Sequence, residues 1–160
     1  MLHFARLLLK SPAYLYLYDF ITIFSGVKAL NSGQQANDIN EICYEKVLDF
    51  VRKGHQVMVF VHARNATVKT AMKLLEEASN RGKTEVFLPN DSPQYGVAQK
   101  SISKSRNKQL VELFNGGFGI HHAGMLRSDR SLVEKLFGQG FIKVIKLISR
   151  SFLWKIIHVL

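Results

Sequence analysis

The chain has 160 residues, 47% of them hydrophobic, so it can bury roughly two thirds of its unfolded surface in one compact core. Its 22 Lys and Arg outnumber its 12 Asp and Glu, and the formal charge of +10 favours an anionic partner such as nucleic acid or an acidic surface. Cys43 is the only cysteine, which excludes an intrachain disulfide and predicts an apolar core position on a helix. No apolar run reaches about 18 residues without interruption, so a membrane-spanning helix is unsupported.

The first half of the chain reads as helix, strand and helix. Asp38 to Lys53 repeats apolar residues at helical spacing and is expected to end at Gly54. Val57 to Val61 is a run of apolar, mostly β-branched residues, which predicts a central parallel strand. We expect Asn65 to cap the next helix, which stops near Gly82. In that helix Lys73 to Glu77 are expected outside, and the inner face is expected to hold Val68, Ala71, Met72 and Leu75.

The middle of the chain is less regular. Thr84 to Leu88 reads either as a second short strand or as an ordered connection, and Pro89 to Pro93 as a turn. Ser103 to Phe114 predicts an amphipathic helix, closed by Asn115-Gly116-Gly117, where glycine supplies a left-handed cap. A basic run near this helix is read as a solvated outer face; it consists of Lys100, Lys104, Arg106 and Lys108.

A strand and a helix are predicted next. Phe118 to His122 is short and extended, and Ser128 to Phe137 repeats apolar residues at helical spacing. Ser131 and Glu134 stand at capping-box spacing, and Gly138 is the expected stop. The residues expected to face inward are Leu132, Val133, Leu136 and Phe137.

This alternation of helix and strand predicts an α/β fold: a three-layer parallel sheet with helices on both faces. Right-handed crossovers place the carboxyl ends of all parallel strands at one edge, where ligands bind in such sheets. Polar residues follow both predicted strands there. After the first strand come His62, Arg64, Asn65 and Thr67, and after the second His121, His122, Gly124 and Arg127.

Two of these residues, Arg64 and Arg127, carry planar guanidinium groups that suit phosphate, although Arg64 could instead pair with Glu76 or Glu77. The small residues at 123 and 124 allow a backbone to approach closely. A metal pair at His121 and His122 is disfavoured, because neighbouring strand residues point to opposite faces and no Cys or Asp is spaced to complete a site. One histidine is expected to be packed and the other exposed.

Two segments resemble a known family. Phe60-Val-His-Ala-Arg-Asn-Ala-Thr67 is similar to motif IV of the superkiller-type DExH nucleic-acid helicases. Gly119-Ile-His-His-Ala-Gly-Met-Leu-Arg-Ser-Asp-Arg130 is similar to the segment before motif V in the same proteins. The resemblance extends over about Ile23 to Val144, and the order and spacing of the two motifs make it specific. It implies an incomplete second RecA-like domain, the helicase C-terminal domain.

The resemblance also implies a role for the predicted edge. In the family, equivalent positions line the track of the single strand that is moved, a role carried here to Arg64, Asn65, Thr67, His122, Gly124 and Arg127. Such binding is made through the phosphates, does not depend on base sequence, and weakens as the salt concentration rises. The resemblance implies no catalytic, cofactor-binding or metal-binding residue in this chain.

ATP and Mg²⁺ belong, by the same resemblance, to a cleft between two RecA-like domains. The first domain supplies the Walker A loop and the DExH box, and neither is present here. Gly82-Lys83-Thr84 lacks the glycine five residues earlier that a P-loop requires, because residue 77 is Glu. Motifs V and VI should follow Lys143-Val144 but do not. We therefore expect no ATP hydrolysis by this chain alone.

The two ends depart from the family pattern. Residues 1–22 are expected to form a leader, residues 23–144 the partial RecA-like domain, and residues 145–160 a divergent basic and apolar tail. Ile142 to Ile148 should be a central strand, but Lys146 interrupts it, and a buried unpaired lysine is costly. Read as a helix, the same stretch and its continuation form a basic amphipathic pattern that could meet a membrane or a partner groove.

A complete relative is expected to be an ATP-dependent helicase that unwinds DNA or RNA in the nucleus and cytosol. The resemblance connects it with alkylation repair, transcription coactivation and ribosome quality control. For this chain we expect weak binding of single-stranded nucleic acid or of subunits of a coactivator complex. Two alternatives remain open at this point: an interaction module that competes with the complete helicase, and a truncated splice product without a role.

Overall fold

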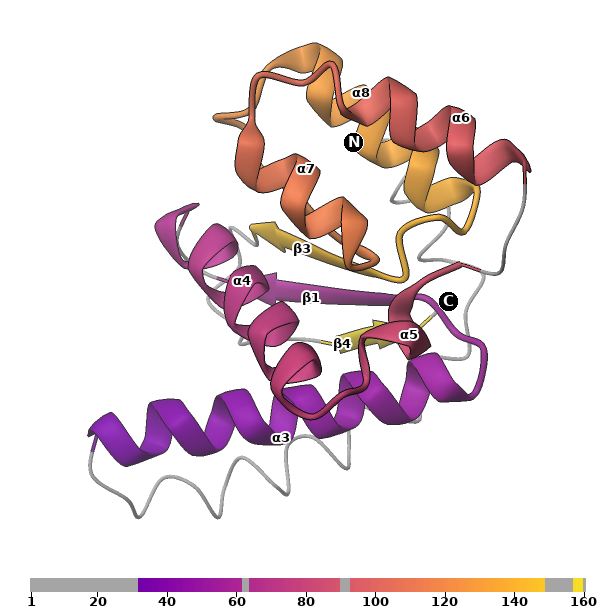
Figure 1. Cartoon of the computed structure of the whole chain (residues 1–160). Helices are drawn as coiled ribbons and strands as arrows, with labels where there is room; N and C mark the ends of the chain where they lie inside the picture. The colour runs from indigo at the N-terminus through magenta and orange to yellow at the C-terminus, as the bar shows by residue number, and fades with distance from the viewer. Residues whose placement is uncertain (1–31, 62–63, 90–92, 149–156, 160) are drawn as a thin grey trace.

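A computed structural model describes residues 32–61, 64–89, 93–148 and 157–159 (Figure 1). The predicted leader, residues 1–22, and most of the predicted tail lie outside these ranges. The fold is built on one four-stranded sheet, in the order β2-β3-β1-β4. The strands are β1 (Val57–Val61), β2 (Phe118–His121), β3 (Val144–Ile148) and β4 (Ile157–Val159).

The sheet is parallel except at one edge. β1 and β2 both pair in parallel with β3, whereas β4 runs antiparallel to β1. The described helices are α3 (Ser32–Arg52), α4 (Arg64–Asn80), α5 (Thr84–Phe87), α6 (Pro93–Ile102), α7 (Lys108–Asn115) and α8 (Arg127–Gly138). The predicted α/β class with a parallel sheet is confirmed.

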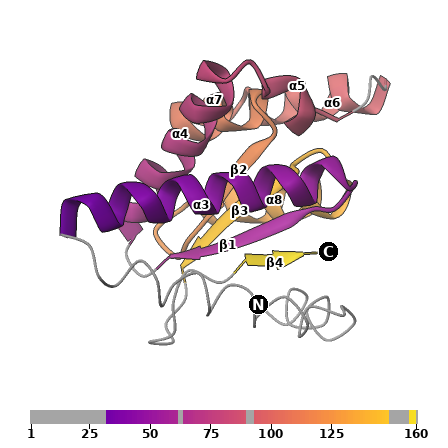
Figure 2. The ribbon, with the colours of Figure 1, turned by 90° about the horizontal axis from the view of Figure 1, so that it is seen from below.

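Helices cover both faces of the sheet. The connection from β1 through α4 to β2 crosses two strand positions, and that through α8 to β3 crosses one position back, so right-handed crossovers put α4 and α8 on opposite faces. Figure 2 shows α4, α5 and α7 together on one side of the strands. On β2, Phe118 packs on Phe87 of α5 with ring centroids 4.8 Å apart, while a side chain at Gly119 would lie 3.6 Å from Val133 of α8.

The core lies between these layers. Cys43 is buried on α3, as predicted, next to the fully buried Tyr44. The rings of Tyr44, Phe87 and Phe118 follow one another from α3 through α5 to β2, with 6.4 Å between the first two centroids. α3 ends at Arg52, close to Gly54, whose φ of +87° confirms the predicted stop. This cluster fixes the long helix and the short helix α5 against the sheet.

Lys146 occupies the middle of the central strand. Its register partners are Val59 and Ile120, and it is only 1% exposed. The strand interpretation of this stretch is therefore right, and the helical interpretation is wrong for residues 144–148. The β-branched and apolar residues around Lys146 favour the strand strongly enough to bury a lysine within it.

Several predicted helix details are wrong. α4 begins at Arg64, so Asn65 lies within its first turn and does not precede the helix. Leu74, placed on the outer side by the pattern, is buried. Thr84 to Leu88 contains the short helix α5 and not a strand, because burying Phe87 decides its conformation.

The second half also differs at its helix ends. The predicted helix Ser103 to Phe114 starts only at Lys108, because the Asn107 side chain accepts a hydrogen bond from the Leu110 N–H and caps α7. Pro93 to Ile102 forms a separate helix that was not predicted. The predicted capping residue Ser131 lies inside α8, since that helix begins four residues earlier. Gly138 remains helical, and the left-handed glycine after α8 is Gly140, with φ of +80°.

Candidate nucleic-acid interface

The loops after β1 and β2 lie at the same edge of the sheet. Both strands run parallel to β3, and their last residues, Val61 and His121, pair with Ile148 and Leu147 at the end of that strand. α4 and α8 then begin within a few residues of the strand ends. Two helix N-termini therefore start at one edge with a single strand between them.

The six predicted binding residues differ in how far the structure exposes them to solvent. Gly124 and Arg127 are exposed, His122 is half-buried and Thr67 is fully buried. Arg64 and Asn65 belong to the first turn of α4, but their side chains lie outside the described part of the structure. The exposed part of the predicted track, as far as it is described, is thus the loop between β2 and α8.

This loop is held by local contacts. The Met125 N–H donates to the His122 carbonyl at 3.1 Å and closes a turn that presents Gly124. Arg127 is the first residue of α8, where unpaired backbone N–H groups carry partial positive charge. An exposed guanidinium beside such a helix end suits an anion such as a nucleic-acid phosphate.

His121, at the end of β2, makes a contact that holds the fold together. His121 Nε2 lies 2.7 Å from Glu134 Oε1, which ties the end of β2 to α8. Both His121 and His122 are half-buried, so the expected split into one packed and one exposed histidine is wrong. Within the described ranges, no three His, Cys, Asp or Glu side chains gather as a metal ion requires.

Residues 82–84 do not fit a nucleotide phosphate. A P-loop joins a strand to a helix, so that backbone N–H groups face the phosphates at the helix start. Gly82 instead follows α4, has φ of +61°, and leads into a helix of four residues. No step involving ATP is therefore assigned to these residues.

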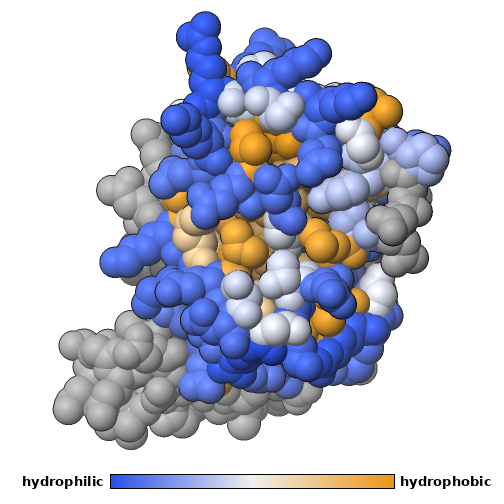
Figure 3. All heavy atoms as spheres, in the orientation of Figure 1, coloured by the Kyte–Doolittle hydropathy of each residue, from blue (hydrophilic) through white to orange (hydrophobic). Residues whose placement is uncertain are grey.

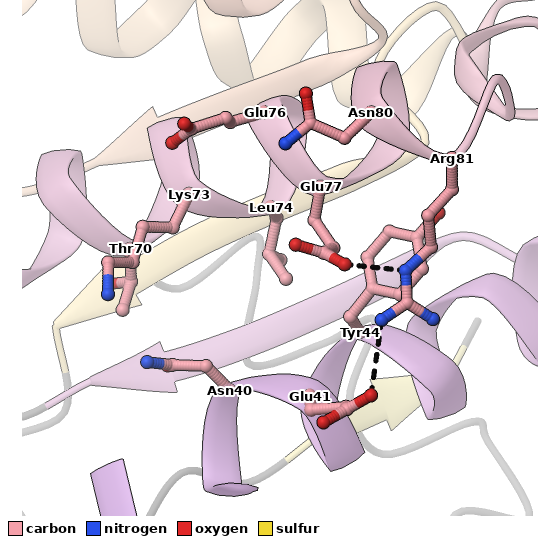
Figure 4. Close-up of a pocket in the computed structure, with 10 residues that line it drawn as sticks. All are labelled: Asn40, Glu41, Tyr44, Thr70, Lys73, Leu74, Glu76, Glu77, Asn80 and Arg81. Atoms are coloured by element: carbon pink, nitrogen blue, oxygen red, sulfur yellow. Dashed lines mark hydrogen bonds and ion pairs between the residues drawn. The ribbon is translucent and has the colours of Figure 1, made fainter. Parts of the chain in front are cut away.

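A second polar cluster lies away from this edge, between α3 and α4 (Figure 4). Arg81 contacts Glu45, and its guanidinium lies 2.5 Å from a Glu77 oxygen and 3.2 Å from a Glu41 oxygen. The same group lies 4.9 Å from the centre of the Tyr44 ring. The hydrogen bond to Glu77, more than any other contact, raises the pKa of Arg81. Sequence reasoning missed this cluster, although Glu77 and Arg81 stand four residues apart in the sequence, as do Glu41 and Glu45 on α3.

Tyr44 forms the floor of the Arg81 cluster, and its hydroxyl is buried without a hydrogen-bond partner among the described residues. Burial raises the pKa of this hydroxyl, and the nearby Arg81 opposes that shift. The folded chain therefore keeps Tyr44 neutral at pH values at which the unfolded chain ionises it. Stability that depends on the neutral hydroxyl is present below about pH 10 and lost as the pH rises further.

We expect Tyr44→Phe to stabilise the fold by about 1 kcal/mol at neutral pH, because it removes a buried polar group that has no hydrogen-bond partner within the described ranges. The variant should also lose less stability than the parent above about pH 10. Urea unfolding across that pH range measures both effects. Tyr95, whose pKa is also raised by burial, is common to both proteins and cancels in the comparison. Lower stability of the variant at neutral pH would contradict the prediction.

Comparison with known proteins gives a consistent result, although no protein-family profile matches the chain. Activating signal cointegrator 1 complex subunit 3 of Mus musculus is 62% identical over 122 residues, 76% of this chain and 6% of that protein. The DExH-box ATP-dependent RNA helicase DExH14 of Arabidopsis thaliana is 48% identical over 122 residues, with the same shares of the two chains. The RQC trigger complex helicase SLH1 of Saccharomyces cerevisiae is 43% identical over 114 residues, 71% of this chain and 6% of that protein.

These similarities confirm the resemblance carried by the two motifs. The chain spans about 6% of the length of these relatives, so it corresponds to one part of a much larger helicase. The fold agrees with an incomplete RecA-like domain, since its parallel strands and flanking helices alternate as in such domains. In the described part of the chain, no helix combines the length and apolar character needed to cross a membrane. The chain belongs to the DExH helicase family of activating signal cointegrator 1 complex subunit 3.

Proposed function

We propose that this chain binds single-stranded nucleic acid as part of the second RecA-like domain of an ATP-dependent helicase. The observation that carries the proposal is the parallel pairing of β1 and β2 with β3, which brings their loops to one edge. The names of the similar proteins, which include an RNA helicase, support a nucleic-acid ligand. We also propose that the chain divides into a leader (residues 1–22), the partial RecA-like domain (residues 23–144) and a divergent tail (residues 145–160).

Binding would use charge and backbone approach more than base contacts. Arg127 offers a bidentate phosphate donor, and Gly124 leaves room for a sugar-phosphate chain to pass close to the loop. The net charge of +10 adds a long-range attraction for polyanions. Affinity should therefore be similar for different base sequences and fall steeply with salt.

The motor activity is proposed for the larger protein and not for this chain alone. There, a first RecA-like domain would supply the phosphate loop and the acidic box that hold ATP and Mg²⁺, while this domain would supply part of the strand track. We place that protein in the nucleus and cytosol, with other subunits of the activating signal cointegrator 1 complex as partners. Its proposed processes are alkylation repair, transcription coactivation and ribosome quality control, the last supported by the name of the yeast relative.

The decisive experiment compares two charge deletions on α8. We expect Arg127→Gln to weaken binding of labelled single-stranded RNA and DNA about fivefold, and to reduce the magnitude of the negative slope of log affinity against log salt by about one. Lys135→Gln removes the same charge from the exposed far end of the helix and serves as the matched control. Fluorescence anisotropy of the full chain, from low to moderate salt, measures both quantities.

Two outcomes would refute the proposal. The first is no binding of either nucleic acid at low salt. The second is an equal loss for the Arg127 and Lys135 variants, since that would reduce the interaction to net charge.

A further inference from the structure

We propose that the surface across the C-terminal half of α4 docks a basic segment of a partner protein that carries an apolar anchor. This surface, the α4 saddle, consists of two hollows on either side of α4. The first lies between α3 and α4 and has a volume of about 470 Å³ (Figure 4). The second lies on the α7 side of α4 and has a volume of about 540 Å³. Glu76 and Asn80 line both hollows, so these two side chains form the ridge between them.

The acidic residues of the α4 saddle indicate which kind of partner would bind there. Five of the 12 acidic residues of this basic chain line or border the saddle: Glu41, Glu45, Glu76, Glu77 and Glu112. Three of them share one cation, Arg81, while Glu76 and Glu112 form no ion pair with any residue that the structure describes. The cations that line the hollows are Arg81 and Lys73, so the five carboxylates leave an excess of negative charge. This excess would repel a phosphate chain and attract Lys or Arg side chains.

Both hollows are lined by apolar as well as polar residues, which favours a segment with both basic and apolar side chains. Half-buried Met72 and Leu75 line the second hollow, and apolar groups also show between polar residues on this face in Figure 3. An apolar side chain that covers them would remove their exposed surface from water. An amphipathic basic segment satisfies both requirements, because it carries its apolar and cationic groups at fixed spacing.

The Tyr44 hydroxyl supplies an independent sign of a ligand. Tyr44 lines the first hollow, and its hydroxyl is fully buried and has no hydrogen-bond partner in the described structure. Buried polar groups in native proteins nearly always have a partner. A polar group of a bound segment would supply one once the Arg81 side chain, which lies over the Tyr44 ring, moves aside.

The saddle is separate from the proposed strand track. Arg81 directly follows α4, whose first residue is Arg64 at the sheet edge, and 17 helical residues span about 25 Å. A partner on the saddle would therefore leave the edge free, and both ligands could bind one molecule together. The proposal goes beyond nucleic-acid binding and stands or falls separately from it.

The test uses the full chain and a fluorescein-labelled peptide of Leu-Lys-Lys-Leu repeats, with anisotropy as the readout. We expect Glu76→Gln combined with Glu112→Gln to weaken peptide binding about tenfold, because both unpaired carboxylates are lost. The matched control is Asp49→Asn combined with Glu85→Gln, which removes two exposed charges that line neither hollow. Its affinity should stay within about twofold of the parent.

Further arms separate the alternatives. An Ala-Lys-Lys-Ala peptide should bind more weakly, and single-stranded RNA should bind the Glu76 and Glu112 variant at least as well as the parent. The proposal is overturned if both double variants lose peptide affinity equally, if a Leu-Glu-Glu-Leu peptide binds as well, or if the alanine peptide matches the leucine peptide. Concentration-dependent dimerisation that the Glu76 and Glu112 variant abolishes would also overturn it, because a second copy would then be the occupant.

Discussion

Replacing Gly117 by alanine is expected to destabilise the fold by about 4 kcal/mol, a large share of the stability of a domain of this size. Gly117 has φ of +82°, and an added Cβ would lie 1.9 Å from the Phe87 carbonyl oxygen and 2.6 Å from its carbon. Both atoms are backbone, so no side-chain rotation relieves the clash. The Gly117 carbonyl also accepts the N–H groups of Lys143 and Val144, so a displaced Gly117 disturbs the start of the β2–β3 pairing.

Urea unfolding of the full chain measures this loss, and Gly54→Ala is its matched control. Gly54 has nearly the same backbone angle, with φ of +87°, but an added Cβ there would meet nothing within 4 Å. The control should therefore lose only the strain of a left-handed alanine, about 1 kcal/mol. Similar losses for the two variants would show that α5 can move away from β2 at little cost.

The second large effect is expected for Phe87→Ala, at about 3 to 4 kcal/mol, because it opens a cavity in the core. Phe87 is fully buried, although it sits in a helix of only four residues. Its ring contacts Phe118 of β2 and Tyr44 of α3, so one side chain joins three elements. Thermal or urea unfolding, read by far-ultraviolet circular dichroism, measures the change.

Two substitutions calibrate this result. Phe87→Leu keeps most of the apolar volume and should cost about 1 kcal/mol. Val97→Ala, at a residue 66% exposed on the next helix, should change stability by less than about 0.5 kcal/mol. If Phe87→Ala cost no more than Val97→Ala, α5 would not belong to the core.

Strands with uniform patterns were predictable from sequence, and elements with mixed signals were not. Val57–Val61 is apolar throughout, and the structure has the predicted strand at those residues. Val144–Ile148 contains Lys146, whose charge supported a competing helical interpretation until strand pairing on both sides decided the matter. Pairing partners that lie far away in sequence leave no local signal.

The helix errors have local causes. Pro93 and Gly96 are poor helix formers, so α6 was missed, although a proline is acceptable in the first turn of a helix. Asn107 caps α7 within a stretch that was predicted as one continuous helix. The cap was missed because a single asparagine is a weaker signal than an apolar repeat at helical spacing. Phe87 shows the same limit, since burial against Phe118 and Tyr44 determines the helical conformation of its segment.

The candidate sites were predictable to different degrees. The loop carrying Gly124 and Arg127 follows a recognisable strand, so its place at the sheet edge could be deduced from the amino-acid sequence. The burial of Thr67 could not, because it depends on how the first turn of α4 packs. The α4 saddle could not be predicted from the sequence, because Glu41 and Glu45 reach Arg81 only where α3 packs against the end of α4.

The strand order has a consequence for synthesis on the ribosome. Val57 pairs with Val144 on one side and Val159 on the other, so β1 emerges long before either neighbour exists. At roughly 5 to 20 residues per second, β1 waits several seconds for its first partner. During that interval an apolar strand with two unpaired edges is present on the nascent polypeptide, which makes it a natural point of contact for chaperones.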